Sequence, residues 1–482
     1  MKPITKKNSA TAVLVFALLA ITFVKIVLVV FASPLMGYGN NYDFIRQSSC
    51  VGVYQTYPGE PARLANPQAP VDTVIYSGVI APSTCMRSID NVYPWIASRF
   101  HKVGDRIGFQ TISAWKIATL LAFGLCLMVL VKDRWSRLVV TLAFALIFGD
   151  LGVLLYANTL YLEFSVVMSG FFAVFATALL LSGQHGNKSV VAFALIAMLW
   201  LGATKQQYMP LAAALGLTCA LALWLRGVRK RYALVFVVSS LCIPVAYALA
   251  NHTDSSLLKA VRFANNTDTW LGAVLPAAPD KAAALARVGL PPSCEPGIGK
   301  TWYDQGMQAQ HPCPAVEHIS RVRLLSLFLY APATFTEPMY QAIQQTYPFY
   351  TSYLGHLSSP DTANTRSYRL LRVTSLSHWL ARQGPEGAVP ETLFALIVAA
   401  IALLAWLRTW HSDPGLQLPL AITWLGGGLI IYSLASSVFG DGYIELQKHA
   451  VLLLPGFGFV LAGALLSLCK LVGMLAARRA SP

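Results

Sequence analysis

Residues 10–32 read ATAVLVFALLAITFVKIVLVVFA, and residues 40–46 read NNYDFIR. The first stretch is long and apolar enough to cross about 30 Å of hydrocarbon as a helix. It is too long for a cleaved signal peptide and lacks a clear small-residue cleavage site, so we expect it to remain as a membrane span. The second stretch places an acid, Asp43, three residues before a base, Arg46, just beyond that span. This arrangement suggests an active site at the membrane surface, centred on Asp43.

The composition extends the prediction of membrane spans to the whole chain. Of its 482 residues, 56% are hydrophobic and only 12% are charged, which is unlike an ordinary soluble protein. Apolar runs of about 18 residues recur, whereas the short alternating strands of a membrane barrel do not. We therefore predict an all-α polytopic membrane protein with about ten transmembrane helices. The predicted spans cover residues 10–32, 113–131, 138–156, 164–182, 189–204, 208–225, 232–250, 391–409, 416–437 and 449–474.

The net charge of +15 is distributed unevenly between the two sides of these spans. On the side that holds residues 40–46, the short connections contain only Lys205 and Lys448. Basic loops stay in the cytoplasm, so we expect both termini there, in a multi-pass protein of the cytoplasmic (inner) membrane with an extracytoplasmic or periplasmic active site. The basic excess reports topology and predicts no nucleic-acid partner. The basic residues on the N-terminal side are Lys2, Lys6, Lys7, Lys132, Arg134, Arg137, Lys188, Arg226, Arg229, Lys230, Arg231, Arg408, Arg478 and Arg479.

This topology divides the chain into five regions. The second outward loop, of about 140 residues, is too long for a simple connector and must have structure of its own. The regions are the N-terminus with the first span (1–32), a first extracytoplasmic loop (33–112), a bundle of spans two to seven (113–250), a large extracytoplasmic loop or lobe (251–390), and a bundle of spans eight to ten with the cytoplasmic C-terminus (391–482).

Each outward loop holds two of the eight cysteines. Cys50 and Cys85 share the first loop, and Cys294 and Cys313 share the second. An oxidising compartment favours pairing within a loop, so we predict the disulfides Cys50–Cys85 and Cys294–Cys313. Free, buried thiols are the alternative.

Both outward loops contain stretches with helical spacing of apolar residues. Residues 93–109 predict an amphipathic helix at the membrane interface. In the second loop, residues 319–329 and 366–382 predict helices, and the latter carries arginines at positions 366, 369 and 372 on roughly one face. That face suits lipid headgroups or a lipid-linked phosphate, and equally suits solvent close to the membrane.

Polar residues also gather where the third predicted span ends. Asp150, Tyr156, Asn158, Tyr161 and Glu163 occur within fourteen positions. A simple turn between two spans does not need these groups. Burying an ionisable residue within an apolar run costs free energy, so its presence there suggests a function. The alternative is an interfacial belt of tyrosines with a solvated Glu163.

Two further outward turns carry ionisable groups. Residues 205–208 read KQQY, and a lysine followed by two amides suits an anion such as phosphate, although a lysine at the end of a span can also simply snorkel. Residues 440–449 read GDGYIELQKH, in which two glycines permit a tight backbone around Asp441. Topology therefore places four polar clusters at similar depth. One acid to accept a proton, with bases to neutralise a phosphate leaving group, is the minimum for glycosyl transfer from a lipid-phosphate sugar.

These motifs resemble those of the GT-C superfamily, the polytopic glycosyltransferases that use polyprenyl-phosphate donors. The resemblance is closest to bacterial hexose transferases of surface-glycan biosynthesis. It is carried by NYDFxR at 41–46, YxNxxYxE at 156–163, KQQY at 205–208, and GDG at 440–442 with KH at 448–449. With the spans it covers most of the chain, but residues 251–390 match no motif.

The resemblance implies a polyprenyl-phosphate sugar as donor, a glycan or lipid-linked glycan as acceptor, and inversion at the anomeric carbon. Asp43 matches the position of the catalytic base, with Asp150 or Glu163 as a second acid. The groups expected near the donor phosphate are Arg46, Lys205, Gln206, Gln207, Lys448 and His449. Those expected near the sugar or acceptor are Asn41, Tyr156, Asn158, Tyr161, Asp441 and Glu445. No metal-binding pattern is readable, and metal use within the superfamily varies.

Two alternatives remain open. An O-antigen ligase or polymerase has a similar outline but depends on arginines and a histidine of the outer loop, here Arg366, Arg369, Arg372 and His378. A transporter or flippase for a lipid-linked sugar needs polar groups along a path through the membrane. The crowding of charges at one face argues against transport.

Overall fold

The computed structural model describes residues 6–40, 43–55, 70–183, 188–225, 227, 230–251, 256–409 and 414–480. Several residues named above, including Lys2, Asn41, Arg226 and Arg229, lie outside these ranges.

The described chain is mostly helical and forms a polytopic membrane protein, as predicted. Eight of its described helices are long and apolar enough to cross a membrane. They are α1 (Lys6–Val30), α4 (Phe109–Leu130), α7 (Glu163–Leu181), α9 (Met209–Leu225) together with the preceding 3-10 turn η3 (Gln206–Tyr208), α10 (Lys230–Ala250), α17 (Ala388–Arg408), α18 (Pro414–Asp441) and α20 (Leu453–Ala480). A shorter apolar helix, α8 (Lys188–Thr204), lies between α7 and α9 in sequence.

Helix α7 is the centre of the bundle. Its sequence is apolar on every side, and every one of its residues is buried, which is typical of a helix surrounded by other helices. It packs against α8, α9 and α18. Close packing elsewhere uses glycine: a Cβ added to Gly426 of α18 would lie 2.9 Å from the carbonyl oxygen of Gly456 in α20. Small residues of this kind let membrane helices approach each other closely.

The span predicted over 138–156 is shorter in the structure. Helix α5 (Arg134–Phe148) ends before Gly149, and a single turn, α6 (Leu151–Leu154), follows. Asp150 separates the two, because its carboxylate caps α6 by accepting the Gly152 N–H at 2.7 Å. An N-cap residue has non-helical backbone angles, so the apolar run cannot continue as one helix through this position.

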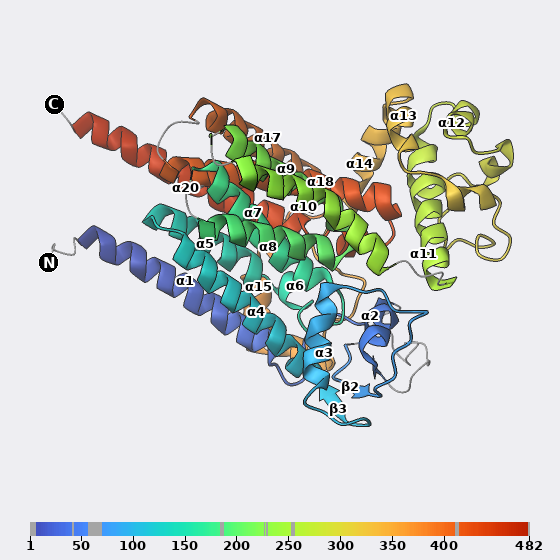
Figure 1. Cartoon of the computed structure of the whole chain (residues 1–482), viewed down its shortest axis with the longest axis horizontal. Coiled ribbons are helices and arrows are strands. Elements are labelled where there is room, and N and C mark those ends of the chain that lie inside the picture. Colours follow the sequence, from blue (N-terminus) through green and yellow to red (C-terminus); the bar gives the residue numbers. More distant parts are fainter. Residues whose placement is uncertain are drawn as a thin grey trace.

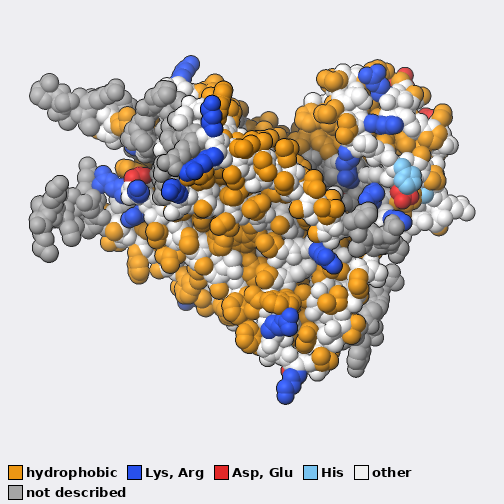
Figure 2. Space-filling model, viewed as in Figure 1, with side chains coloured by type: hydrophobic (Ala, Val, Ile, Leu, Met, Phe, Trp, Pro, Cys, Tyr) orange, Lys and Arg blue, Asp and Glu red, His pale blue; other side chains and the backbone are white. Residues whose placement is uncertain are grey.

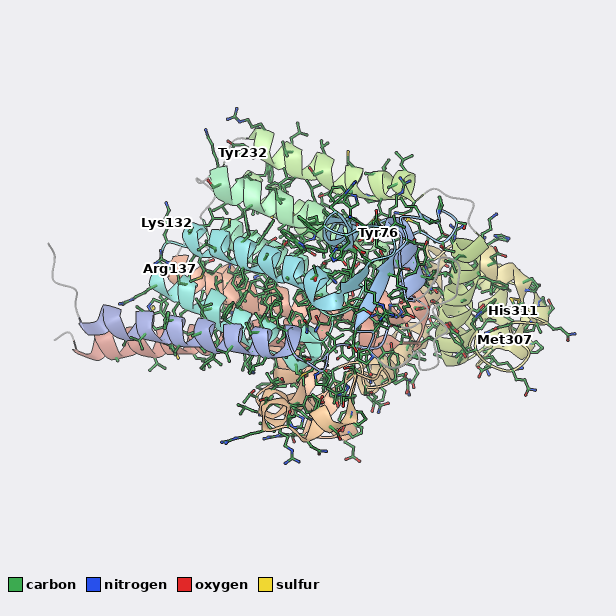
Figure 3. The ribbon with its side chains drawn as sticks, turned by 90° about the horizontal axis from the view of Figure 1, so that it is seen from below. Tyr76, Lys132, Arg137, Tyr232, Met307 and His311 are labelled. Atoms are coloured by element: carbon green, nitrogen blue, oxygen red, sulfur yellow. A yellow bond between two sulfur atoms is a disulfide. The ribbon has the colours of Figure 1, made fainter. Side chains whose placement is uncertain are left out.

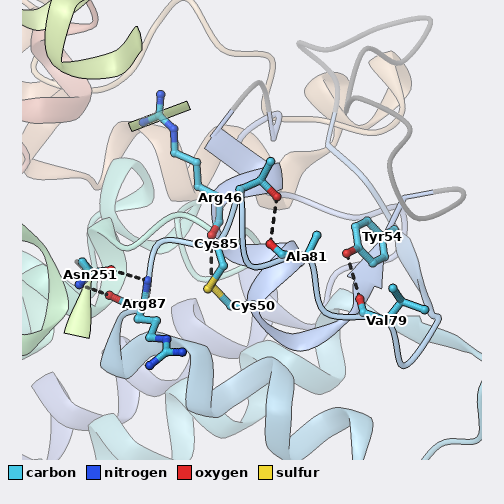
Figure 4. The surroundings of a disulfide bond; sticks show 9 residues. Arg46, Cys50, Tyr54, Val79, Ala81, Cys85, Arg87 and Asn251 are labelled. Carbon is cyan, nitrogen blue, oxygen red and sulfur yellow. Dashed lines mark hydrogen bonds between the residues drawn. A yellow bond between two sulfur atoms is a disulfide. The ribbon is translucent and has the colours of Figure 1, made fainter. Parts of the chain in front are cut away.

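The first of the two long loops, predicted over 33–112, is more regular than its sequence suggests. Helix α2 (Asp43–Val51) is followed by a three-stranded antiparallel sheet of β1 (Val53–Tyr54), β2 (Thr73–Tyr76) and β3 (Arg106–Gly108), in which Val53 pairs with Tyr76 and Val74 with Ile107. The helix predicted over 93–109 is the shorter α3 (Val92–Ser98), because the chain turns into β3. The predicted disulfide Cys50–Cys85 is present and joins the end of α2 to residues 81–87 (Figure 4).

The second long loop, predicted over 251–390, contains a lobe with its own small core. Helix α11 (Ser256–Thr267) runs into a π-helical turn, η4 (Asp268–Val274), and α12 (Lys281–Val288) and α13 (Arg323–Tyr330) pack nearby. Trp270 and the predicted Cys294–Cys313 disulfide lie in the core of the lobe. Helix α14 (Ala333–Gln345) follows, and the single helix expected over 366–382 is broken into α15 (Arg366–Val373) and α16 (Leu376–Ala381).

The two loops that the sequence predicts to face outward gather at one end of the bundle. The chain termini lie at the opposite end, and the lobe of α11–α13 projects beyond α18 (Figure 1). Hydrophobic side chains cover the middle of the visible face of the bundle (Figure 2). Lys132 and Arg137 lie near the termini, whereas Met307 and His311 lie in the distant lobe (Figure 3). The predicted outward loops therefore share one end of the molecule.

Candidate functional site

A cavity of about 780 Å³ lies between the bundle and the lobe, and we call it the site cavity. The walls come from α2, the start of α7, the turn before α9, helix α11 and the end of α18. The four polar clusters of the sequence therefore meet at one place. The predicted site residues that line it are Asp43, Arg46, Tyr161, Glu163, Lys205, Gln206, Gln207, Asp441, Glu445 and His449.

Asp43 begins helix α2, where a carboxylate is favoured by the positive end of the helix dipole. One carboxylate oxygen lies 2.7 Å from the Arg46 guanidinium, and the other lies 2.5 Å from the Lys448 ammonium. Burial alone would raise the pKa of Asp43, but Arg46 and Lys448 together hold that pKa well below its usual range. The carboxylate is thus kept ionised at the rim of the cavity.

Lys448 lies in the short helix α19 (Leu446–His449) and is fully buried. Its ammonium contacts both Asp43 and Glu445, and it lies 4.8 Å from the centre of the Tyr161 ring. Burial would lower the pKa of Lys448, but the two carboxylates raise it well above its usual value. Glu445 has a left-handed backbone (φ 48°), which is rare for a residue other than glycine. Lys448 therefore holds two carboxylates in place and does not line the cavity, although the sequence suggested a direct contact with phosphate.

A series of polar contacts links four residues that line the site cavity. Glu163, which is almost fully buried, accepts a hydrogen bond from Lys205 at 2.8 Å. The same ammonium lies 3.3 Å from Nδ1 of His449, whose Nε2 lies 2.8 Å from a carboxylate oxygen of Asp441. A neutral His449 that accepts at Nδ1 and donates at Nε2 satisfies both neighbours. The contacts link α7, the turn before α9 and the end of α18.

The turn at residues 205–208 is fixed to the last outward turn. The Gln207 amide donates to the His449 carbonyl oxygen at 3.0 Å and to the Ser436 hydroxyl at 3.1 Å. The Tyr208 hydroxyl donates to the same carbonyl oxygen at 2.7 Å. Gln207 therefore positions His449, whereas Gln206 lines the cavity.

Besides Lys448, three described residues of the predicted site lie away from the cavity lining. The Asp150 carboxylate, which is fully buried, accepts hydrogen bonds from the Ser377 N–H at 2.7 Å and the Ser377 hydroxyl at 2.9 Å. The Asn158 amide donates to the Met36 carbonyl oxygen at 2.6 Å, and the Tyr156 hydroxyl contacts Thr351. These groups satisfy buried polar atoms, which explains polar residues within an apolar stretch. Asn158 joins the bundle to the segment after α1, whereas Asp150 and Tyr156 join it to residues 377 and 351 of the second loop.

The lobe contributes residues that the sequence reasoning missed. Asp268, Trp302, Tyr303 and Arg321 line the site cavity from the side opposite α2. They belong to the region without a matching motif, and their meeting depends on how the lobe docks on the bundle. The contact is close, because a Cβ added to Gly442 would lie 2.5 Å from the Asp268 carbonyl oxygen.

An apolar groove of about 790 Å³ adjoins the site cavity. It runs between α4, α8 and α10, and its lining includes Trp115, Trp200 and Ile243. Arg87 lies at its outer end, where the Arg87 N–H donates to Asn251 at 2.8 Å (Figure 4). Tyr247 lines both the groove and the cavity, so the two spaces lie next to each other at this side chain.

The groups required by the ligase alternative lie elsewhere. Arg372 and His378 line a separate pocket of about 90 Å³ beside α6. Arg366 and Arg369 are exposed on α15. Among the described residues, no group of three or more His, Cys, Asp or Glu side chains is placed to hold a metal ion.

Comparison with known families assigns nearly the whole chain to a described family. The family model described as the YfdI N-terminal transmembrane domain matches residues 2–474, which is nearly the whole chain. The chain matches no curated protein and no solved structure.

Proposed function

The chain belongs to the YfdI N-terminal transmembrane domain family, whose members are glycosyltransferase-like membrane proteins of the GT-C type, and we propose on this basis that it is an inverting hexosyltransferase. The donor is a polyprenyl-phosphate hexose, and the acceptor is a glycan or a lipid-linked glycan. The observation that carries the proposal is the junction at Tyr247 between a polar cavity and an apolar groove. A lipid-phosphate sugar has the same division into polar head and apolar tail.

The donor occupies both spaces at once. Its polyprenyl chain lies in the groove, where aromatic and aliphatic side chains exclude water. Its phosphate faces Arg46, Lys205 and His449, which line the site cavity. Arginine and lysine stabilise a phosphate through charge-assisted hydrogen bonds. Lys448 has a supporting role, because it is buried beneath the lining and occupied by Asp43 and Glu445.

Transfer is a single displacement. The acceptor hydroxyl oxygen forms a bond to the anomeric carbon while the bond from that carbon to the phosphate oxygen breaks, so the configuration inverts. The carboxylate of Asp43 takes the hydroxyl proton in the transition state. The electron pair of the broken bond leaves on the lipid phosphate, where Arg46 and Lys205 stabilise its charge.

Donor binding also prepares the base. In the structure Arg46 and Lys448 lower the pKa of Asp43 against the opposing effect of burial. A phosphate that draws Arg46 toward itself removes part of this effect, so the pKa of Asp43 rises and the carboxylate becomes a stronger base. Arg46 thus links occupancy of the phosphate position to the basicity of Asp43.

The proposed orientation places the site cavity outside the cytoplasmic membrane, with both termini inside. Lys132 and Arg137 lie at the end of the bundle that holds the termini (Figure 3), as expected for basic cytoplasmic loops. Single cysteines replacing Lys300 in the lobe and Lys230 at the start of α10 test this. An impermeant thiol reagent added to intact cells should label the first and spare the second, and labelling of both would contradict the orientation.

A transfer assay with purified protein in lipid nanodiscs tests the function. A panel of polyprenyl-phosphate sugars is offered with oligosaccharides of a cell-surface glycan, and the product is one residue longer with inverted configuration. A ligase would instead move a whole glycan from a polyprenyl diphosphate. A flippase would move labelled lipid across the bilayer without product. Either result in place of single-sugar transfer would refute the proposal.

A further inference from the structure

The two walls of the site cavity differ in chemistry. The bundle side carries paired acids and bases, in which Arg46 contacts Asp43 and Lys205 contacts Glu163. The lobe side supplies residues 260, 261, 264, 265 and 268, whose spacing of three or four places them on one face of α11 and its continuation. The polar and aromatic residues of this second wall include Asn265, Asp268, Trp302 and Tyr303. We call these four residues the lobe wall.

Asp268 lies where α11 changes from α-helical to π-helical geometry, a local irregularity that is frequent at functional sites. One carboxylate oxygen accepts the Trp302 N–H at 2.6 Å, which ties the helix to the segment carrying the two aromatic residues. Burial raises the pKa of Asp268 to about 7, and the nearby Asp441 adds to this rise. The group is therefore able to accept or donate a hydrogen bond near neutral pH.

One of the two aromatic residues of the lobe wall, Trp302, packs against other rings of the lobe. The Trp302 ring is packed against Phe263 at 4.9 Å and His311 at 5.9 Å between ring centres. Tyr303 is 65% exposed although it lies along the cavity. An exposed aromatic face beside hydrogen-bonding groups is a surface that is apolar in one direction and polar in another.

Asn265 completes the polar part of the lobe wall. With its amide oriented to satisfy its neighbours, the nitrogen donates to Asp441 at 3.0 Å and to the Val261 carbonyl oxygen at 2.8 Å. Arg321 donates to the Gly440 carbonyl oxygen at 2.6 Å and so fixes the lobe to the last outward turn. These contacts connect the wall to the end of α18.

We propose that the lobe wall is the binding subsite for the acceptor saccharide, with a sugar ring against Trp302 and Tyr303 and its hydroxyls hydrogen-bonded to Asp268 and Asn265. The inference rests on the proposed glycosyltransferase function and adds the location of the acceptor. A pyranose offers C–H groups to an aromatic face and hydroxyls to carboxylates and amides at its edge. A donor phosphate is expected on the bundle side, beside Arg46 and Lys205, because the four residues of the lobe wall include no cation.

The test uses full-length protein in nanodiscs and measures transfer from a polyprenyl-phosphate hexose to a soluble oligosaccharide of the cell-surface glycan. Tyr303→Ala should raise KM for the oligosaccharide about tenfold and leave KM for the donor unchanged. Tyr340→Ala is the matched control, because Tyr340 is also exposed in the second outward loop but does not line the cavity. Asp268→Asn should raise the same KM while slow hydrolysis of the donor by water continues.

An unchanged KM for the oligosaccharide in both Tyr303→Ala and Asp268→Asn would overturn the subsite. So would a rise confined to KM for the donor. If the wild-type protein transfers no sugar, the proposed function fails, and saturation-transfer NMR with the oligosaccharide then decides the subsite separately. Binding that is lost in Tyr303→Ala and kept in Tyr340→Ala supports it, whereas the absence of binding to the wild-type protein overturns it.

Discussion

Asp43 and Asp150 are two acids at the same end of the bundle, and their surroundings differ in kind. Asp43 is held by two cations, Arg46 and Lys448, and lines a large cavity. Asp150 is fully buried and held by neutral donors, namely two N–H groups and the hydroxyl of Ser377. A substrate anion can draw a cation away from a carboxylate, whereas it cannot reach an enclosed cap. The comparison assigns chemistry to the first acid and structure to the second.

The largest expected difference between them is in turnover. Asp43→Asn keeps the size of the side chain but removes its ability to accept a proton, so kcat should fall by about 100- to 10,000-fold. Asp150→Asn should retain most of its turnover per folded molecule. Single-turnover transfer with saturating donor measures both.

Folded protein in each preparation is quantified by size-exclusion chromatography, so that loss of folding is not mistaken for loss of chemistry. Donor binding to Asp43→Asn should be close to normal. If Asp43→Asn is active and Asp150→Asn is inactive, the catalytic base lies at the end of α5. If Asp43→Asn is active and Glu163→Gln is inactive, the base lies at the start of α7.

The second expected difference concerns the cations near each acid. Lys205→Gln keeps a hydrogen-bond donor toward Glu163 but removes the charge beside the cavity, so KM for the donor should rise roughly 10- to 100-fold. Arg372→Gln, beside the small pocket near Asp150, should change this KM little. The opposite ranking would favour the ligase alternative, for which Arg372 and His378 are central.

The free energy of unfolding, unlike turnover, should depend on Asp150. Asp150→Ala leaves the donors of Gly152 and Ser377 without their acceptor, which should cost roughly 2–4 kcal/mol and lower the thermal midpoint by several degrees. Asp361→Ala, at an exposed acid in the same outer region, should have little effect. Melting in detergent, followed by intrinsic fluorescence, measures both variants. An unshifted midpoint for Asp150→Ala would mean that the cap contributes nothing to the fold.

The sequence predicted the gathering of Asp43, Lys205 and His449, because the ends of spans on one side of a membrane must lie close together. It also predicted both disulfides, which the structure confirms, because Cys50–Cys85 and Cys294–Cys313 each share one loop. These inferences needed only topology, which follows from hydropathy and charge.

Other features depend on tertiary contacts that hydropathy does not record. Asp150 has the same residue type and depth as a catalytic acid, and only its bonds to Ser377, more than two hundred residues away in sequence, identify it as a cap. The lobe wall was missed for a related reason. Asp268 and Trp302 face the cavity because the lobe docks on the turn at Gly442, and no local pattern signals that docking.

The smallest expected effect concerns the pH dependence of activity. The test replaces the lysine beside each acid, Lys448 or Lys25, and measures kcat/KM against pH. Lys448 lowers the pKa of Asp43, so Lys448→Met should let that pKa rise under the influence of burial. A general base works only when ionised, so the acid limb of kcat/KM should move to higher pH in this variant. Lys25→Met removes the lysine that donates to the Gly149 carbonyl oxygen beside Asp150, and it should leave the limb in place.

Because Lys448 also lowers the pKa of Glu445, the profile is repeated with Glu445→Gln added, and the displacement should persist. Lys448→Arg restores a cation and should return the limb toward its original position. Superimposable profiles for the wild type and Lys448→Met would show that the carboxylate next to Lys448 is not the group whose ionisation limits the reaction.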